Sequence, residues 1–160
     1  ASTPVIYKGR AYIGVGGSGN FAPYSGHNIS VIDLKSNTIA YSIETRGYPQ
    51  ASSLLTTAYE KDDQSVYVYF FENLTPGKMR VIKDKPGQTA PSEVQIETDN
   101  RQNQYTVAPT LFTPSGAHAQ YVICSPIADE YGNIYFKNDS SHMFMIGPTI
   151  KELRITQKPK

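Results

Sequence analysis

The sequence predicts an all-β protein made of antiparallel four-stranded sheets, and three observations support this fold class. Of its 160 residues, 12 are tyrosine and 6 are phenylalanine, and aromatic and β-branched residues favour strands. Its 12 glycines and 11 prolines are spread along the chain, which indicates turns between short strands. No segment repeats apolar residues with the period of a helix over three turns, so very little helix is expected.

Four strands are expected within the first 45 residues. Alternation of apolar and polar residues predicts strands at 3–6, 10–15, 28–34 and 38–45. Lys8-Gly9 and Lys35-Ser36-Asn37 form short turns, and a loop rich in glycine, serine and asparagine covers 16–27. Because consecutive strands joined by short turns usually pair with each other, these four strands should form one antiparallel sheet.

The strand pattern then starts again twice. A second set of strands is expected at 53–59, 65–71, 78–83 and 93–97, followed by a polar bridge at 99–104. A third set is expected at 121–125, 134–137 and 142–146, with a last strand at 150–156. We therefore expect β units over 1–149, divided near 1–50, 51–104 and 105–149. Residues 150–160 are expected to be a strand or linker that leads toward a following domain.

A short repeat relates the three units. Ala11-Tyr12-Ile13, Val66-Tyr67-Val68 and Ile134-Tyr135-Phe136 each place a tyrosine between two apolar residues. Internal similarity of this kind indicates a repeat architecture. The residues expected in the core lie at equivalent points of the repeat or in its most apolar strands: Tyr12, Ile32, Tyr67, Val68, Ile123 and Tyr135.

The first and third units resemble the blades of PQQ-like, quinoprotein-type β-propellers. Each begins with Ser/Thr-Pro and continues to a Gly-x-apolar-Tyr step, and residues 29–41 look like the outer hairpin of such a blade, with Asp33 at the family's aspartate and Tyr41 in place of its usual tryptophan. Residues 150–160 resemble the opening strand of a bacterial immunoglobulin-like domain. The resemblance implies a partial propeller of about three blades from the C-terminal part of a large bacterial surface or secreted protein, and a β-sandwich is the alternative fold.

Composition and charge exclude several classes of function. The formal net charge is +1, which argues against a strongly basic nucleic-acid-binding domain. A single cysteine, Cys124, excludes an intramolecular disulfide and is expected to be a buried structural thiol. No run of about 18 apolar residues is present, so no membrane-spanning segment is expected.

The sequence shows no catalytic constellation, and no cofactor or metal is expected. Residues 14–19 fit Gly-x-Gly-x-x-Gly, but a dinucleotide site needs a helix after this pattern, whereas a loop follows here. Quinone enzymes of the resembling family stack their cofactor on tryptophan and often on a vicinal disulfide, and this chain has no tryptophan. Residues 129–133 offer too few oxygen donors for a calcium loop and are expected to be a polar turn. The histidines, His27, His118 and His142, lack the spacing of metal ligands.

Four residues in or beside loops are the candidates for ligand binding: Tyr24, His27, Tyr48 and Tyr131. Tyrosine combines a flat apolar ring with a polar hydroxyl, which suits a protein or glycan ligand. The expected function is a non-enzymatic scaffold or binding module, extracellular or at the cell surface; this location follows from the resemblance alone. The alternative is a fragment of a cofactor- or metal-dependent oxidoreductase or hydrolase of propeller fold.

The number of units leads to an expectation about partners. Closed propellers have about 4–8 blades because their wedge-shaped sheets must complete a circle. Three units leave two open sides, each with apolar surface that another sheet would normally cover. We therefore expect the chain either to associate with itself or to be completed by blades upstream.

Overall fold

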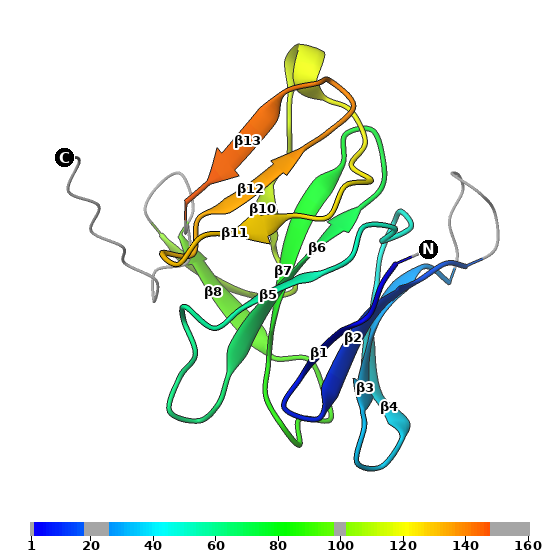
Figure 1. Cartoon of the computed structure of the whole chain (residues 1–160), viewed down its shortest axis with the longest axis vertical. Coiled ribbons are helices and arrows are strands. Elements are labelled where there is room, and N and C mark those ends of the chain that lie inside the picture. Colours follow the sequence, from blue (N-terminus) through cyan, green and yellow to red (C-terminus); the bar gives the residue numbers. More distant parts are fainter. Residues whose placement is uncertain (1, 18–25, 98–101, 148–160) are drawn as a thin grey trace.

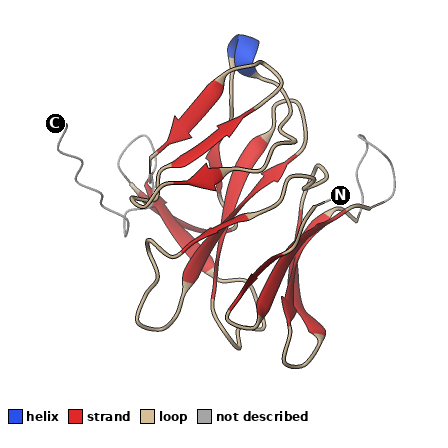
Figure 2. Cartoon of the chain, in the orientation of Figure 1, coloured by secondary structure: helices blue, strands red, loops and turns tan. Residues whose placement is uncertain are grey.

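The computed structural model of the chain describes residues 2–17, 26–97 and 102–147 (Figure 1). Within these ranges every regular element is a strand, apart from one short 3₁₀ helix, η1 (Gly116–His118) (Figure 2). The strands form antiparallel sheets of two to four strands. The predicted all-β fold class is therefore confirmed.

Sheet 1 is a meander of four strands in the order β1-β2-β3-β4. Its strands follow the sequence prediction closely: β1 (Val5–Tyr7), β2 (Arg10–Val15), β3 (Asn28–Asp33) and β4 (Thr38–Glu44). The turn between β3 and β4 is held by Asp33, whose Oδ1 accepts hydrogen bonds from the backbone N–H groups of Lys35 and Ser36 at 2.9 and 3.0 Å. These bonds lower the pKa of Asp33, the bond from Ser36 most strongly.

Sheet 2 has the strand order β10-β7-β6-β5, so its fourth strand comes late in the chain. Its strands are β5 (Leu54–Thr56), β6 (Val66–Glu72), β7 (Lys78–Asp84) and β10 (Thr110–Phe112). Between β7 and β10 the chain forms a hairpin of β8 (Glu93–Glu97) and β9 (Asn103–Val107), which have no other strand partner in the described part of the chain. The strand predicted at 93–97 exists, but its expected place in the second sheet is wrong.

Sheet 3 consists of β11 (Ile127–Ala128), β12 (Ile134–Lys137) and β13 (Met143–Ile146) in this order. The strand predicted at 121–125 is wrong, because this segment has no ladder partner among the described residues. It runs irregularly along the end of sheet 2, where the backbone N–H of Gly77 donates to the carbonyl of Gln120 at 2.9 Å. Val122 is buried beside Gly77, whereas Ile123 is 50% exposed. The predicted core position of Ile123 is therefore also wrong.

Sheet 2 lies between the other two sheets (Figure 1). Every residue of its central strand β6 is buried, which is why this strand has an almost continuous apolar sequence. Val68 and Phe70 belong to the cluster shared with sheet 1, whereas Tyr67, Tyr69 and Phe71 belong to the cluster shared with sheet 3. Successive side chains of one strand thus fill two separate cores.

The two cores explain which core predictions hold. Tyr12, Tyr67 and Val68 are buried between sheets, as predicted. Ile32 and Tyr135 are only half-buried, because the strand register places them on the outer faces of sheets 1 and 3. Antiparallel sheets packed face to face occur in propeller blades and in sandwiches, so the arrangement is compatible with both.

A buried ion pair fastens sheet 1 to sheet 2. Arg10 at the start of β2 donates from Nε and Nη2 to the two carboxylate oxygens of Asp84 at the end of β7, both at 3.0 Å. The hydroxyls of Tyr12 and Tyr41 donate to the same carboxylate at 2.8 and 2.7 Å. Arg10 is 2% exposed and Asp84 is fully buried. Four hydrogen bonds thus satisfy a carboxylate that has no contact with water.

The same site raises the pKa of both tyrosines above the ordinary range. Burial is the largest cause for Tyr12 and Tyr41, and the negative charge of Asp84 adds to it. A raised pKa means that the fold favours the protonated phenol. The tyrosines therefore stabilise the fold fully below the ordinary tyrosine pKa of about 10, and this stability falls as the pH rises above it.

Arg10→Met should lower the free energy of unfolding by roughly 3–5 kcal/mol, because it leaves Asp84 buried without its cation. The control is Lys85→Met, which breaks the exposed pair with Asp63 and should cost less than about 1 kcal/mol. Urea unfolding followed by circular dichroism measures both. Equal effects of the two substitutions would contradict a structural role for the buried pair.

Tyr41→Phe should make stability less dependent on pH above pH 10. Each tyrosine that ionises only in the unfolded chain lowers the free energy of unfolding by about 1.4 kcal/mol per pH unit, so the variant loses one such contribution. Urea midpoints measured from pH 9 to pH 11.5 give the slope. Equal slopes in the wild-type protein and in Tyr41→Phe would refute the assignment.

Candidate functional site

An open groove of about 840 Å³ lies where the end of β4, the β6–β7 hairpin and the β8–β9 hairpin meet. Its walls come from segments far apart in the sequence, and most of its lining side chains are polar or charged. The lining residues are Glu44, Thr45, Arg46, Glu72, Lys78, Arg80, Ile96, Gln104, Thr106, Val107, Ala108, Pro109 and Thr110. None of these residues was among the sequence candidates, because no local motif joins them.

Arg80 on β7 holds the walls of the groove together. Its Nη1 contacts Glu72 Oε1 at 2.6 Å and donates to the carbonyl of Glu44 at 3.0 Å. Its Nε donates to the carbonyl of Ala108 at 2.8 Å. One guanidinium therefore links the end of β4, strand β6 and the segment that leads into β10, and a planar group with several donors is suited to this.

Two further cations line the groove without being used by the fold. Among the described residues, the side chains of Lys78 and Arg46 have no hydrogen-bond or ion-pair partner. Arg46 is exposed and Lys78 is half-buried. Since Arg80 is neutralised by Glu72, these two side chains and the carboxylate of Glu44 are the charged groups that can meet a ligand here. The groove can bind a group that carries negative charge and accepts hydrogen bonds.

The structure brings together two of the four sequence candidates. The rings of His27 and Tyr48 stack, with centroids 5.8 Å apart and an interplanar angle of 18°. His27 is only 1% exposed, and its Nδ1 accepts a hydrogen bond from the backbone N–H of Gly17 at 2.8 Å. His27 therefore packs inside the molecule, and Tyr48 is half-buried over it. Tyr24 lies outside the described residues.

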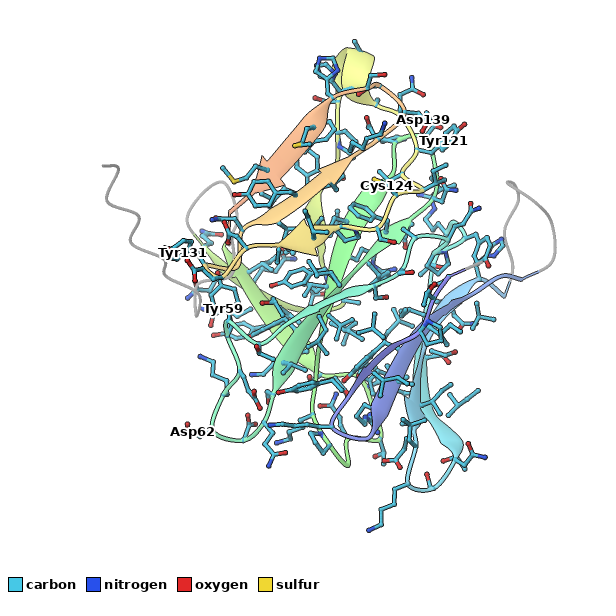
Figure 3. All side chains as sticks on the ribbon, in the orientation of Figure 1. Tyr59, Asp62, Tyr121, Cys124, Tyr131 and Asp139 are labelled. Atoms are coloured by element: carbon cyan, nitrogen blue, oxygen red, sulfur yellow. The ribbon has the colours of Figure 1, made fainter. Side chains whose placement is uncertain are left out.

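Tyr131 lies on a different sheet, in the turn between β11 and β12. It is 58% exposed, and its carbonyl accepts a hydrogen bond from the hydroxyl of Tyr59 at 2.7 Å (Figure 3). Burial raises the pKa of Tyr59 to about 12. Of the candidate tyrosines that the structure describes, Tyr48 stacks on His27 and Tyr131 lies in the β11–β12 turn, so these two do not form one site.

The polar turn expected at 129–133 is present. Asp129 Oδ1 accepts hydrogen bonds from the backbone N–H groups of Tyr131 and Asn133 at 3.0 and 2.9 Å. Its Oδ2 accepts from the Asn133 amide and the Tyr135 hydroxyl at 2.8 and 3.0 Å. The bonds with Asn133 are the main reason why the pKa of Asp129 is lowered. This carboxylate is used to close a turn.

The spacing of the histidines in the sequence did not predict that two of them lie side by side. His118 in η1 and His142 before β13 have ring centroids 3.9 Å apart, although 24 positions separate them in the chain. His118 Nδ1 is buried and has no hydrogen-bond partner among the described residues. The described ranges contain no group of three or more histidine, cysteine or acidic side chains placed to hold a metal ion.

Cys124 is half-buried, less enclosed than expected. It lies in the irregular segment that precedes β11 (Figure 3). Its Sγ contacts the carbonyl oxygen of Lys137 at 2.6 Å. The expected full burial is wrong because the predicted strand at 121–125 does not form, and without this strand the segment stays at the edge of the molecule.

No family model matches this chain, and a search of curated proteins finds no match to its sequence. Within the described residues, no helix is long and apolar enough to cross a membrane.

The first glycine of the Gly-x-Gly pattern has a packing role. Gly14 lies on β2, and a Cβ there would overlap the carbonyl oxygen of Pro49. A Cβ at Gly16 would come no closer than 3.4 Å to the ring of Tyr48. The pattern therefore lets the chain before β5 pass close to sheet 1, beside the stacked His27 and Tyr48.

Gly14→Ala should lower the free energy of unfolding by about 1–3 kcal/mol, because the backbone at Pro49 must move. Gly16→Ala is the control and should change stability by less than about 1 kcal/mol. Thermal unfolding followed by circular dichroism compares the two variants. A Gly14→Ala protein as stable as Gly16→Ala would show that the close approach does not constrain the fold.

Proposed function

We propose that the chain is a non-enzymatic module of propeller type from a bacterial cell-surface or secreted protein. It acts as a scaffold and binds a protein or glycan ligand. The observation that carries this proposal is that the buried charged side chains are used to join sheets. The alternative, a fragment of a metal- or cofactor-dependent enzyme, is favoured by one observation, the close pair His118 and His142.

The partners of the buried charges support a structural role. Asp84 is bound by Arg10 and two tyrosine hydroxyls, and Glu72, at 3% exposed, is bound by Arg80. A general acid or base must reach a proton of the substrate within hydrogen-bond distance. These carboxylates instead face side chains of the neighbouring strands, which fits a scaffold.

The groove supports a binding role beside the structural one. Lys78 and Arg46 supply positive charge, and Gln104, Thr106 and Thr110 supply polar side chains along the same walls. Cations that the fold does not use are available for a ligand, and charge-assisted hydrogen bonds to carboxylate or sulfate are among the stronger polar contacts. We therefore expect the ligand, whether protein or glycan, to present negative charge.

The resemblance to PQQ-like blades supports the propeller type. The tyrosines of the first two copies, Tyr12 and Tyr67, are buried between successive sheets, where a blade-forming residue is expected. The surface or secreted location rests on this resemblance.

Lys78→Gln combined with Arg46→Gln should abolish binding of acidic ligands. Backbone amide NMR titration of the wild-type chain with a glutamate hexapeptide and with an oligogalacturonate should shift resonances around the groove for at least one probe. The double variant should show no such shifts, whereas Lys35→Gln, in the exposed β3–β4 turn, should bind as the wild type does. No shift with either probe would overturn the proposed ligand class.

Native mass spectrometry of the purified protein tests the enzyme alternative in the same preparation. The proposal expects neither a stoichiometric metal nor a stoichiometric cofactor after incubation with zinc, which imidazole ligands favour, or with calcium and pyrroloquinoline quinone. A one-to-one adduct that is lost in His118→Ala or His142→Ala would overturn the non-enzymatic proposal.

A further inference from the structure

The tyrosines of the sequence repeat point toward equivalent sides of their sheets. In the first two copies the tyrosine faces the following sheet: Tyr12 packs in the core shared with sheet 2, and Tyr67 packs in the core shared with sheet 3. The apolar neighbours point the opposite way. Val68 faces sheet 1, and Ile134 and Phe136 face sheet 2. Each internal contact therefore joins the tyrosine face of one sheet to the opposite face of the next.

Sheet 3 presents its tyrosine face to no other sheet among the described residues. A cross-strand row of Ile127, Tyr135 and Met145 runs over its three strands on this face. Ile127 is 67% and Met145 59% exposed, and Met143 next to them is 77% exposed. This is the place in the repeat where Tyr12 and Tyr67 are covered.

The outer face of sheet 1 is the one opposite to its repeat tyrosine. Its outer side carries a row of Ile6, Ala11, Ile32 and Ile39 across all four strands. Ile6 and Ile39 are each 64% exposed. Ala11 and Ile13 flank Tyr12 as Ile134 and Phe136 flank Tyr135, so this row corresponds to the faces by which sheets 2 and 3 contact the sheet before them. In this row Ala11 is buried and Ile32 half-buried between the two exposed isoleucines. Exposed large apolar side chains gathered on one face favour an interaction surface.

We propose that the two rows are the two halves of one interface, in which the outer face of sheet 3 packs on the outer face of sheet 1 of a second copy of this chain. The contact continues the internal one, since it again joins a tyrosine face to an opposite face. Each row matches the other row but not itself. The interface is therefore head-to-tail, with a different surface of each copy in contact, rather than one in which both copies use the same surface. Two copies supply six sheets, a number within the range of about 4–8 at which stacked sheets close into a ring.

This inference rests on the scaffold proposed above and names its partner. The scaffold proposal and this interface can fail separately, because the ligand titration and the mass spectrometry of metal and cofactor adducts change residues outside both rows. The occupant is a second copy, since the chain itself carries both matching faces.

The wild-type chain should form a two-chain assembly in sedimentation equilibrium over micromolar to millimolar concentrations. Ile6→Lys with Ile39→Lys disables the face of sheet 1, and Ile127→Lys with Met145→Lys disables the face of sheet 3. Each double variant alone should be monomeric or have a dissociation constant raised by more than about tenfold. Tyr105→Lys, an exposed site on β9, is the matched control and should associate like the wild type.

Mixing the two double variants gives the sharper test. Each keeps the face that the other has lost, so one intact contact can form and a mixed dimer should appear. Thermal unfolding shows that the variants are folded. A wild-type monomer at the highest concentration would overturn the proposal. So would association of either double variant alone at wild-type strength, or a mixture that stays monomeric while the wild type dimerises.

Discussion

The arrangement of the sheets depends on the carboxylate of Asp84. It lies at the end of β7 with no exposure to water, and it is bound from sheet 1 by one guanidinium and two phenols. An uncompensated charge in this place would be strongly unfavourable, so Arg10, Tyr12 and Tyr41 can lie only where they reach it. This fixes the registration of sheet 1 over sheet 2. Removing this ion pair from water is costly. We therefore infer that the pair orients sheet 1 on sheet 2 rather than adding net stability to the fold.

The second constraint is the double burial of sheet 2. A sheet covered on both faces needs apolar side chains on both sides of its central strands, and β6 meets this requirement from Val66 to Phe71. Polar groups are left to the ends of the strands, where Glu72 and Arg80 form the wall of the groove. The place of the candidate binding site therefore follows from the stacking, because only the ends of the buried sheet can present charged side chains.

Sequence patterns predicted the fold class and many strands, with the bounds of β2, β8 and β12 matched. They missed β9, which begins with the polar pair Asn103 and Gln104, and β10, which is three residues long with an irregular register. They placed a strand at 121–125 because an apolar run looks the same whether or not it has a ladder partner; Val122 is buried here by contact with Gly77. The groove and the histidine pair were not predictable, because each joins residues that only the tertiary fold brings together.

The late position of β10 has a consequence for how the chain folds. Sheet 1 is formed by strands that follow each other directly in the chain, so each of its pairings joins neighbouring strands. Sheet 2 is complete only when β10 pairs with β7, and the intervening segment contains the β8–β9 hairpin. Loop closure costs less entropy when the enclosed chain is already compact, so formation of the hairpin shortens the effective loop. We expect sheet 1 and the β8–β9 hairpin to form early and the β7–β10 edge to form last. We also expect this edge to be the first part of the molecule to open in local unfolding.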